Sequence, residues 1–564
     1  MLQTKIVSAM EKCFLDQSTD DFKEIKKLRM YKNERASIQL LVYDDTEERK
    51  ATFLHISIEG YMADFSNART VENIPNYNSN YGKEDAEKFG LLRTTAGLYP
   101  DVLMPLVRGN CMPYYNKQLH TSIVDFEGEL EAGIYPTKFT FCDLENNKVA
   151  ENEIVIEVID AYLPKHNLKV TNWFHADCLA DYYNVEVFSD RHFEICENFI
   201  KTAVKNGINM LLMPVFTPPL DTYVGGERTT TQLVKISLDN GEYTFDFSLV
   251  DRWIDMCNRC GVKYIEVCHL FTQWGAYHAP KVMATVDGEY KRIFGWETDA
   301  KGEEYVKFLR RFLKELTAHL EKRGDKERTY FHISDEPKET DLEQYKINRK
   351  NVTDILDGWN IMDALSDVEF YKDGLVDIPV PITRAIENFM ELDIKERWVY
   401  YCGAPLDTTN RGFALPSPKT RSLGMQLYKY GIDGFLHWGF NFYNNQCSYD
   451  HINPFLNPCG GYFWYDVGGD CHLVYPAQDG TPIESLRLMA TRQAFDDIRL
   501  FRLCESFYDK EFVVAEIEKI IGKIDFFNCV NDVEIMQKIR DRIDDLIIEK
   551  LKGDAKKVRT ARKG

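Results

Sequence analysis

Two adjacent carboxylates, Asp335 and Glu336, are the residues whose type and position most directly suggest catalysis. They end the apolar stretch Thr329–Pro337, whose aromatic and β-branched residues favour a buried β-strand. Pro337 cannot donate to a strand ladder, so the strand should end there and turn both carboxylates toward one cleft. A solvated acidic corner is the alternative, but so apolar a strand ending on two acids needs a reason. We therefore predict that this pair carries the chemistry.

Neighbouring carboxyl groups restrict the kind of reaction. Most glycosidases place two carboxyl groups on opposite sides of the scissile bond, about 5–5.5 Å apart in retaining enzymes and about 6.5–9.5 Å apart in inverting ones. Residues adjacent in sequence cannot straddle a substrate in that way. They suit a substrate-assisted reaction, in which the 2-acetamido oxygen of the sugar attacks the anomeric carbon and forms an oxazoline. One carboxylate then holds the acetamido N–H and its neighbour protonates the leaving oxygen.

An enzyme nucleophile is a second possibility. In one common retaining barrel an Asn-Glu-Pro sequence ends the fourth strand and a nucleophilic Glu ends the seventh. Glu336-Pro337 is similar to the first half of that pattern, with Asp335 in place of Asn. The predicted seventh strand, Trp398–Gly403, contains no carboxylate. Its absence argues against double displacement.

A (β/α)8 barrel is the fold expected to position these residues. From Lys169 onward, strand-like cores alternate with helical periods such as Phe193–Asn206, Leu249–Arg259 and Glu303–Lys322. Ser485–Phe507 is expected to be the last crossover helix. The predicted strands lie at about 170–178, 208–214, 263–269, 329–335, 361–365, 378–384, 398–402 and 433–441.

The segments on either side of the barrel differ in pattern. Residues from about 30 to 160 carry short alternating strands separated by turn residues, which is typical of an antiparallel β-sandwich. Met1–Gln17 has an amphipathic helical pattern, and Val513–Lys550 has the pattern of two amphipathic helices followed by a basic tail. The predicted parts are an N-terminal helix and sandwich at 1–165, a catalytic barrel at 166–510, and C-terminal helices with the tail at 511–564.

The carboxyl ends of the predicted strands collect residues that suit a sugar. Aromatic faces pack on the apolar side of a pyranose, and amides, His and Asp bond its hydroxyl groups. Each has a plainer alternative: aromatics pack in cores, a strand-end imidazole bonds a carbonyl oxygen, and Asp177 caps a turn. Glu266 is interpreted as structural. The predicted substrate-binding residues are His175, Asp177, His269, Gln273, Trp274, Tyr400, Tyr401, Trp438, Asn441 and Tyr443.

Composition excludes some functions. With 69 basic and 89 acidic residues the net charge is −20, which disfavours nonspecific binding to nucleic acid or anionic membranes. No run of about 20 apolar residues occurs, and Met1–Gln17 does not have the pattern of a signal peptide, so a cytoplasmic, soluble protein with reduced thiols is expected. No cofactor and no metal are predicted. A metal-dependent hydrolase remains an alternative, with His175, Asp177 and His269 as its ligands.

Four motifs resemble those of glycoside hydrolase family 123, also described as domain of unknown function 4091. The likeness extends from about Trp173 to Arg502, and Phe440 stands where the family usually has Tyr. The motifs are His332-Ile-Ser-Asp-Glu-Pro337, His269-Leu-Phe-Thr-Gln-Trp-Gly275 with His278-Ala-Pro280, Phe294-Gly-Trp-Glu-Thr298, and Gly434-Phe-Leu-His-Trp-Gly-Phe-Asn-Phe-Tyr443.

The resemblance implies a TIM-type barrel behind an N-terminal sandwich, and a β-N-acetylgalactosaminidase that acts by substrate assistance. Its substrate is then an oligosaccharide or glycoconjugate with a terminal 2-acetamido sugar, with N-acetylglucosamine still open. By position, Asp335 corresponds to the acetamido stabiliser and Glu336 to the general acid/base. A noncatalytic carbohydrate-binding protein on the same fold is the alternative from another class. The intact carboxylate pair argues against it, because a binding protein needs no proton donor.

Overall fold

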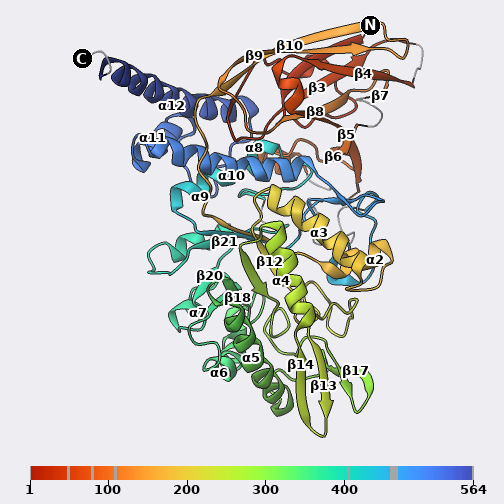
Figure 1. Cartoon of the computed structure of the whole chain (residues 1–564), viewed down its shortest axis with the longest axis vertical. Coiled ribbons are helices and arrows are strands. Elements are labelled where there is room, and N and C mark those ends of the chain that lie inside the picture. The colour runs from red at the N-terminus through yellow and green to blue at the C-terminus, as the bar shows by residue number, and fades with distance from the viewer. Residues whose placement is uncertain are drawn as a thin grey trace. The chain divides into compact units, whose positions relative to one another are not determined.

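The structure is a computed structural model of the 564-residue chain, and it describes residues 2–47, 51–77, 82–106, 111–403, 406–457 and 468–561. The chain forms two compact units (Figure 1). The sheet unit comprises Met1–His166, Arg411–Tyr430 and Ile483–Gly564, and the barrel unit comprises Asn167–Asn410 and Gly431–Pro482. The first division, between His166 and Asn167, lies one residue beyond the predicted boundary at 165/166. Residues 411–430 and 483–510, which the prediction placed in the barrel domain, group with the sheet unit.

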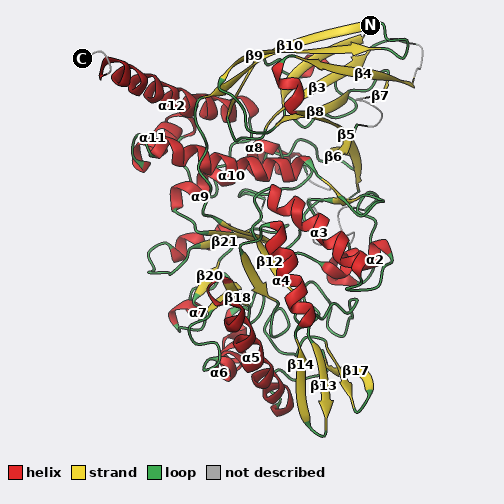
Figure 2. Ribbon diagram, viewed as in Figure 1, coloured by secondary structure: helices red, strands yellow, loops and turns green. Residues whose placement is uncertain are grey.

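Eight parallel strands form a nearly closed barrel in the barrel unit. Figure 2 labels β12, β18, β20 and β21 of this sheet. Their order around the sheet is β20-β19-β18-β15-β12-β11-β22-β21. The two edges meet where Tyr400 N donates to Pro381 O at 3.0 Å, beside a bridge between Ile382 and Tyr400. All eight predicted strands are confirmed; β19 has the expected length, shifted by one residue, and the others are shorter than expected. They are β11 (Lys169–Asn172), β12 (Met210–Met213), β15 (Tyr264–Val267), β18 (Thr329–Phe331), β19 (Asn360–Ala364), β20 (Ile378–Val380), β21 (Trp398–Tyr400) and β22 (Gly434–His437).

The predicted helices of this unit are confirmed as α3 (Asp190–Lys205), α4 (Ser248–Cys260) and α5 (Glu303–Arg323). The side chain of Ser189 caps α3 by accepting from His192 N. Helices α4 and α5 end where Gly261 (φ 89°) and Gly324 (φ 81°) adopt the left-handed conformation. Shorter helices are α2 (Ala176–Tyr183), α6 (Leu342–Val352) and α7 (Glu369–Lys372).

A small four-stranded sheet in the barrel unit is an addition that the sequence analysis missed. Its order is β14-β13-β16-β17, and Figure 1 shows its strands at the lower end of the view. Two-residue turns at Asn240-Gly241 and Asp287-Gly288, all with positive φ, close its hairpins. Asn-Gly and Asp-Gly between alternating residues are strong hairpin signals, so the sequence did contain the information. The strands are β13 (Lys235–Asp239), β14 (Glu242–Asp246), β16 (Val282–Val286) and β17 (Glu289–Phe294).

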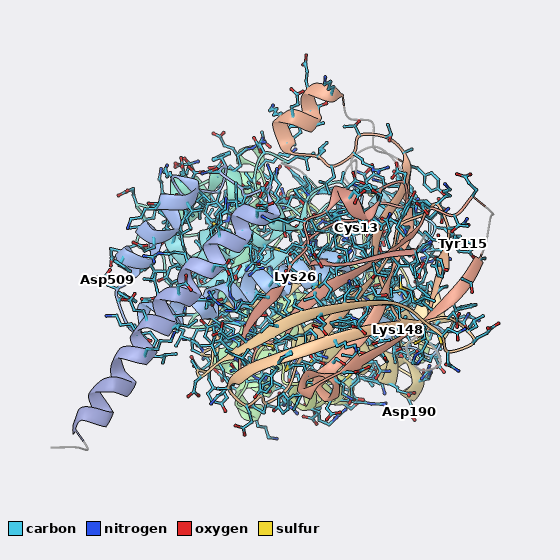
Figure 3. All side chains as sticks on the ribbon, turned by 90° about the horizontal axis from the view of Figure 1, so that it is seen from above. Cys13, Lys26, Tyr115, Lys148, Asp190 and Asp509 are labelled. Carbon is cyan, nitrogen blue, oxygen red and sulfur yellow. The ribbon has the colours of Figure 1, made fainter. Side chains whose placement is uncertain are left out.

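The sheet unit contains two five-stranded sheets, ordered β1-β3-β8-β5-β6 and β2-β10-β9-β4-β7. Both contribute to one hydrophobic cluster, for example Ile38 and Val124 from the first and Ile56 and Phe139 from the second. Figure 3 shows Lys148 beside the long strands of the second sheet. The strands are β1 (Leu2–Ser8), β2 (Lys27–Tyr31), β3 (Ala36–Asp44), β4 (Ala51–Glu59), β5 (Ser66–Asn76), β6 (Gly97–Pro105), β7 (Cys111–Tyr115), β8 (His120–Phe126), β9 (Gly133–Cys142) and β10 (Lys148–Ile159).

The expected N-terminal helix over Met1–Gln17 is wrong. Leu2–Ser8 forms strand β1, which pairs antiparallel with β3. Ile6 and Val7 are both fully buried, on opposite faces of the strand. β-Branched residues favour a strand, and pairing with β3 satisfies the backbone of a segment whose charge spacing alone suggested a helix.

The C-terminal helices of the sheet unit agree with the prediction for Ser485–Phe507 and for two helices beyond it. Helix α12 continues to Ala561, through most of the segment expected to be a tail. None of the helices in the described ranges has the length and apolar character needed to cross a bilayer. Besides α1 (Lys83–Phe89), the helices of this unit are α8 (Ser417–Arg421), α9 (Leu423–Tyr430), α10 (Leu486–Glu505), α11 (Lys510–Ile521) and α12 (Val533–Ala561).

Gly434→Ala tests the packing between β21 and β22. An added Cβ at Gly434 would overlap the ring of Trp398, which is fully buried. We expect the free energy of unfolding to fall by about 1–3 kcal/mol in urea titrations, because the barrel must shift to accept the methyl group. Gly97→Ala is the control, since its Cβ meets nothing within 4 Å and should change stability by about 0.5 kcal/mol or less. Equal effects of the two changes would contradict this packing.

Candidate active site

A cavity of about 270 Å³ lies at the carboxyl ends of the barrel strands. Barrel strands and the loops that follow them supply its wall, as expected for the catalytic face of this fold. Four aromatic side chains and several polar groups line it, which is the mixture found in small-molecule sites. The lining residues are Trp173, Leu220, Asp221, Gln273, Trp274, Asp335, Glu336, Ala364, Tyr400, Cys402, Gly403, Leu436, Trp438 and Gln446.

The segment His332–Glu336 carries the two carboxylates beyond the end of β18. It has no regular ladder pairing, but backbone hydrogen bonds from the loop after β15 hold it along one side. These hydrogen bonds continue the direction of the sheet past the end of β18. Leu270, Phe271 and Trp274 donate their backbone N–H groups to the carbonyl oxygens of His332 (3.0 Å), Ile333 (3.0 Å) and Asp335 (2.8 Å), respectively.

The end of β19 holds the other side of the segment. The Asp363 carboxylate accepts from the backbone N–H groups of Ile333 (2.9 Å) and Ser334 (3.3 Å). Glu336 N donates to Ala364 O at 2.9 Å. The backbone on both sides of Asp335 is therefore fixed by neighbours from two different strands.

Backbone conformation explains how two adjacent side chains reach one cavity. Glu336 has φ 46°, in the left-handed region that residues other than glycine rarely adopt. Trp274 (φ 57°) and Asp221 (φ 40°), which also line the cavity, share this conformation. Such a residue costs about 1–3 kcal/mol and is typically found at functional sites. The bend predicted at Pro337 is thus made one residue earlier, at Glu336 itself.

Tyr400 is the hydrogen-bond partner of Glu336. Its hydroxyl group donates to Glu336 Oε1 at 2.5 Å. Burial and the nearby charge of Glu336 raise the pKa of Tyr400 well above its usual range, so the phenol remains protonated and acts as a donor. Tyr400 therefore fixes one oxygen of Glu336 at the cavity wall.

Asp335 is held at a buried position where the ionised form of its carboxyl group is unfavourable. Burial raises the pKa of Asp335 well above its usual range, and the adjacent Glu336 adds to that effect, whereas His332 opposes it. Neighbouring carboxyl groups titrate as a pair, so one of them binds a proton more readily than an isolated carboxyl group would. The pair can therefore hold one carboxylate and one carboxylic acid together.

Four of the predicted substrate-binding residues line the cavity: Gln273, Trp274, Tyr400 and Trp438. Trp274 leaves 42% of its surface exposed. The side chain of Gln273 accepts from Asp221 N at 2.6 Å, and Trp438 Nε1 donates to Asp470 Oδ2 at 2.6 Å. The aromatic rings and the amide are thus held in place by loops at the barrel rim.

The other six predicted residues do not line the cavity, and for His175, Asp177, Asn441 and Tyr443 the protein itself supplies hydrogen-bond partners. Both oxygens of Asp177 accept from Arg228 at 2.7 Å, and Arg228 also lies 3.1 Å from His175 Nδ1. Asn441 bonds the backbone of His175, and the hydroxyl group of Tyr443 donates to Val474 O at 2.9 Å. All six are buried; they are His175, Asp177, His269, Tyr401, Asn441 and Tyr443.

Several lining residues were not among the predicted site residues. Trp173 lies within the predicted first strand and Asp221 comes after the second, which was a usable signal. Gln446 lies in a long loop after β22 and carries no local signal at all. Arg228, which pairs with Asp177, is 51 residues away in sequence, so only the fold reveals it.

Two sets of residues are possible metal ligands by their type, but neither has the geometry of a metal site. Atoms of His269, His332 and Asp363 lie within 4.8 Å of one another, but the two imidazole rings stack at 4.4 Å with planes 23° apart. A metal ion lies in the plane of each imidazole that binds it, and stacked rings share no such point. The alternative set of His175, Asp177 and His269 is not assembled either, because the Arg228 guanidinium occupies the space between the first two.

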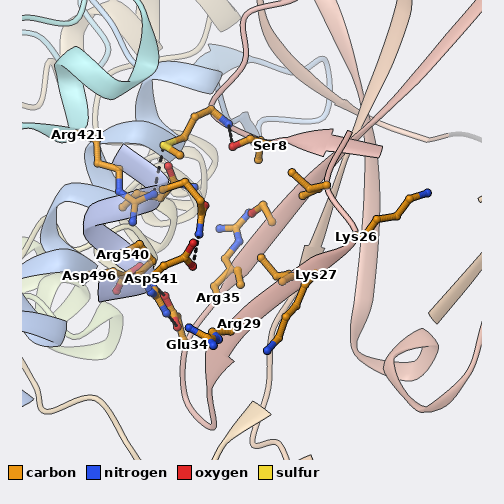
Figure 4. A pocket seen from close by; sticks show the side chains of 18 of the residues that line it. Ser8, Lys26, Lys27, Arg29, Glu34, Arg35, Arg421, Asp496, Arg540 and Asp541 are labelled. Atoms are coloured by element: carbon orange, nitrogen blue, oxygen red, sulfur yellow. Dashed lines mark hydrogen bonds and ion pairs between the residues drawn. The ribbon is translucent and has the colours of Figure 1, made fainter. Parts of the chain in front are cut away.

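A second cavity, of about 460 Å³, lies within the sheet unit (Figure 4). Charged side chains line it, and its cations have carboxylate partners. Arg540 pairs with Glu34 at 2.7 Å, and Arg29 pairs with Asp545 at 2.7 Å. Paired charges of this kind stabilise a crevice without calling for a ligand, so the barrel cavity is the candidate active site.

The comparisons with known proteins agree with this assignment. A model of the glycoside hydrolase 123 catalytic domain matches residues 173–504. A solved family 123 glycoside hydrolase from Clostridium perfringens, described in a study of glycolipid glycan hydrolysis, is 14% identical with a TM-score of 0.75, over 100% of both chains.

Weaker structural matches include a β-glucuronidase from Parabacteroides merdae, 9% identical with a TM-score of 0.32 over 88% of this chain and 53% of that one. An endo-β-1,4-mannanase from Thermotoga petrophila is 12% identical with a TM-score of 0.33, over 59% of this chain and 76% of that one. No curated protein sequence matches the chain. Because the family model covers more than half of the sequence and includes Asp335 and Glu336, the chain belongs to glycoside hydrolase family 123.

Proposed function

We propose that this glycosidase removes a terminal β-linked N-acetylgalactosamine, or a related 2-acetamido sugar, with retention and through an oxazoline intermediate. The observation that supports this most directly is that Asp335 and Glu336 enter one cavity from neighbouring positions. Two such groups cannot act from opposite sides of the bond, but they can assist a nucleophile that the substrate itself supplies.

The roles of the two carboxylates are assigned from their positions in the motif that resembles family 123. Asp335 accepts the acetamido N–H and stabilises the positive charge that develops on the ring of the intermediate. Glu336 donates its proton to the glycosidic oxygen as the acetamido oxygen forms its bond to the anomeric carbon and the leaving alcohol departs. Water then attacks the anomeric carbon of the oxazoline, and Glu336 takes up the proton that this water loses. The two displacements together retain the configuration.

An adjoining cavity suits the leaving group. It shares Trp274, Glu336, Tyr400 and Gln446 with the first cavity and has a volume of about 740 Å³. The general acid must lie at the boundary between the departing sugar and the group it leaves, and Glu336 faces both spaces. The further lining residues Pro337, Lys338, Leu365, Ser366 and Cys447 would then contact the aglycone. Hydrolysis of glycolipid glycans, the subject of the study of the Clostridium perfringens relative, fits a large and open site of this kind.

A retaining reaction with an enzyme nucleophile is the second candidate, and the position of Asp221 in the cavity wall favours it. Asp221 is a third carboxylate in the cavity wall, on the loop after β12. Its Oδ2 accepts from Cys447 N at 3.1 Å, which suits a residue that joins two loops. The seventh strand, β21, supplies tyrosines where the common retaining barrels have their nucleophile.

Four further expectations belong to this proposal. The two sheets that share a core support an N-terminal sandwich, and the family match over 173–504 supports a catalytic region near the predicted limits 166–510. The six buried predicted residues that do not line the cavity are proposed to position the loops that contact substrate. The cytoplasmic location stays a prediction.

A panel of p-nitrophenyl β-glycosides tests the function. Glycosides of N-acetylgalactosamine, N-acetylglucosamine, galactose and glucose are compared, with and without a thiazoline that mimics the oxazoline. We expect cleavage only of the 2-acetamido sugars, and inhibition by the thiazoline. Cleavage of the plain galactoside that resists thiazoline would instead support an enzyme nucleophile, and loss of that activity in Asp221→Asn would identify it. Glycan binding without any cleavage would favour the noncatalytic alternative.

Substitutions at the pair separate the two roles. We expect Glu336→Gln to lower kcat/KM by about 10²–10⁴-fold for alkyl or sugar leaving groups but much less for a dinitrophenyl group, which needs no proton. Asp335→Asn should lower kcat/KM by about 10²–10³-fold whatever the leaving group, because the stabilising charge is lost in every case. Steady-state kinetics over a leaving-group series measure both effects. Wild-type turnover by both variants would remove these assignments.

Asp177→Asn distinguishes a structural residue from a sugar ligand. The change leaves the buried Arg228 without its anion, so we expect the free energy of unfolding to fall by about 3–5 kcal/mol. KM should stay close to that of the wild type, because Asp177 does not line the cavity. Asp190→Asn is the matched control, since it breaks an exposed pair with Arg252 and should cost about 1 kcal/mol or less. A stable Asp177→Asn protein with a raised KM would show a direct role in binding.

A further inference from the structure

A row of three buried ionisable groups lies beneath Asp335. His332 follows β18, and the strands on either side of β18 each direct a carboxylate at it. Glu266 Oε1, on β15, lies 3.4 Å from His332 Nε2, and Asp363 Oδ1, on β19, lies 3.4 Å from His332 Nδ1. All three side chains are completely buried. The sheet order thus places one imidazole between two carboxylates, three residues before Asp335.

The charges of this row differ from those of the neighbouring histidine. Burial alone would lower the pKa of His332, but Asp363 and Glu266 outweigh it and raise the pKa to about 9. His269 stacks on His332, and burial together with the His332 charge lowers its pKa well below the usual range. His332 is therefore an imidazolium at neutral pH, and its stacked neighbour is neutral.

Asp363 connects this row of ionisable groups to the backbone of the segment His332–Glu336. Besides facing His332, Asp363 accepts from the N–H groups of Ile333 and Ser334 and from the hydroxyl group of Tyr345. Thr171 donates to the second oxygen of Glu266 at 2.7 Å. Each carboxylate thus has a fixed position, and the His332 imidazolium between them holds the segment His332–Glu336 in place.

Few other groups face His332. Trp173, which lines the cavity, meets both imidazoles edge-on, at 5.1 Å for His269 and 6.0 Å for His332. The charged groups around His332 are thus Glu266, Asp363 and Asp335, with neutral His269 stacked on it. Among the groups that act on the charge of Asp335, the carboxylates Glu336, Asp363 and Asp221 disfavour its ionisation and His332 favours it.

We propose that His332, held between Glu266 and Asp363, is a positioning residue for Asp335: its positive charge fixes the segment His332–Glu336 and favours the ionised form of Asp335, which the surrounding carboxylates oppose. This inference rests on the proposed function, in which Asp335 acts as an anion toward the acetamido group. In this proposal His332, the first residue of the motif His332-Ile-Ser-Asp-Glu-Pro337, acts electrostatically on Asp335. Glu266 helps to maintain the positive charge of His332. Neither residue touches the substrate.

His332→Gln tests the proposal through the pH profile of kcat/KM. Glutamine keeps hydrogen-bonding groups near both carboxylates but removes the charge, so the pKa of Asp335 should rise. We expect the acid limb of the profile to move to higher pH by about one unit, which is about a tenfold loss of kcat/KM at the acid end. A substrate with a dinitrophenyl leaving group removes the need for the proton of Glu336. A folded variant with the wild-type profile would overturn the inference.

His192→Gln is the matched control, because His192 is equally buried in α3 and bonds Ala176 O and Phe188 N away from the cavity. It should lose stability without any shift of the acid limb. Asp363→Asn is the second variant. It keeps an oxygen for the N–H groups of Ile333 and Ser334 and removes one of the two anions that hold the charge on His332, so His332 should titrate at lower pH than in the wild type.

Nitrogen NMR of histidine-labelled full-length protein tests the charge itself and needs no activity. Both ring nitrogens of His332 should remain protonated at pH 7.5 in the wild type, and its signals are assigned by their loss in His332→Gln or, if that variant does not fold, by their shift in Asp363→Asn. A neutral His332 at pH 7 would overturn the inference even in a fully active enzyme. If instead the wild type cleaves no 2-acetamido glycoside while His332 is charged, the proposed function fails and the charged row stands.

Discussion

The placement of one short backbone segment is the constraint on which the site depends. His332–Glu336 lies past the end of β18, where a barrel strand would normally pass into a free loop. Neighbours on both sides prevent this, because the loop after β15 donates to its carbonyl groups and the end of β19 accepts from its N–H groups. The barrel is needed at this point because only adjacent parallel strands bring residues 270, 335 and 364 into one row.

Charge balance is the second constraint. Asp335, Glu336, Asp363 and Glu266 would place four negative charges in a region that is largely closed to water, and such charges are unfavourable without partners. The fold meets this with one imidazolium, a phenol at Glu336 and several N–H groups, and no Arg or Lys is found among the described residues that line the cavity of about 270 Å³. A cation facing the cavity would pair with Asp335 and compete with the acetamido group. Behind the wall, a cation supports the carboxylate without blocking it.

Sequence patterns predicted the structure correctly where local composition determines it. Apolar runs bounded by glycine and proline predicted all eight barrel strands, and the carboxylate pair was predicted because it ends one of these apolar runs. The patterns failed where tertiary pairing decides: Leu2–Ser8 is a strand because β3 lies beside it. They failed also for rim residues, since a side chain at a strand end turns inward or outward according to its loop. Asp177 and His175 turn toward Arg228, whose position the sequence does not encode locally.

Strain at the cavity is linked to the same hydrogen bonds. Glu336 and Trp274 both have left-handed backbones, and the N–H of Trp274 donates to the carbonyl oxygen of Asp335, the residue before Glu336. Glycine would adopt either conformation freely, but glycine supplies neither a proton donor nor an aromatic face. The chain therefore keeps a strained glutamate and a strained tryptophan side by side, and the bonds to Asp335 and Ala364 offset the cost. Two adjacent carboxylates can share one cavity only because the backbone between them is bent and held in this way.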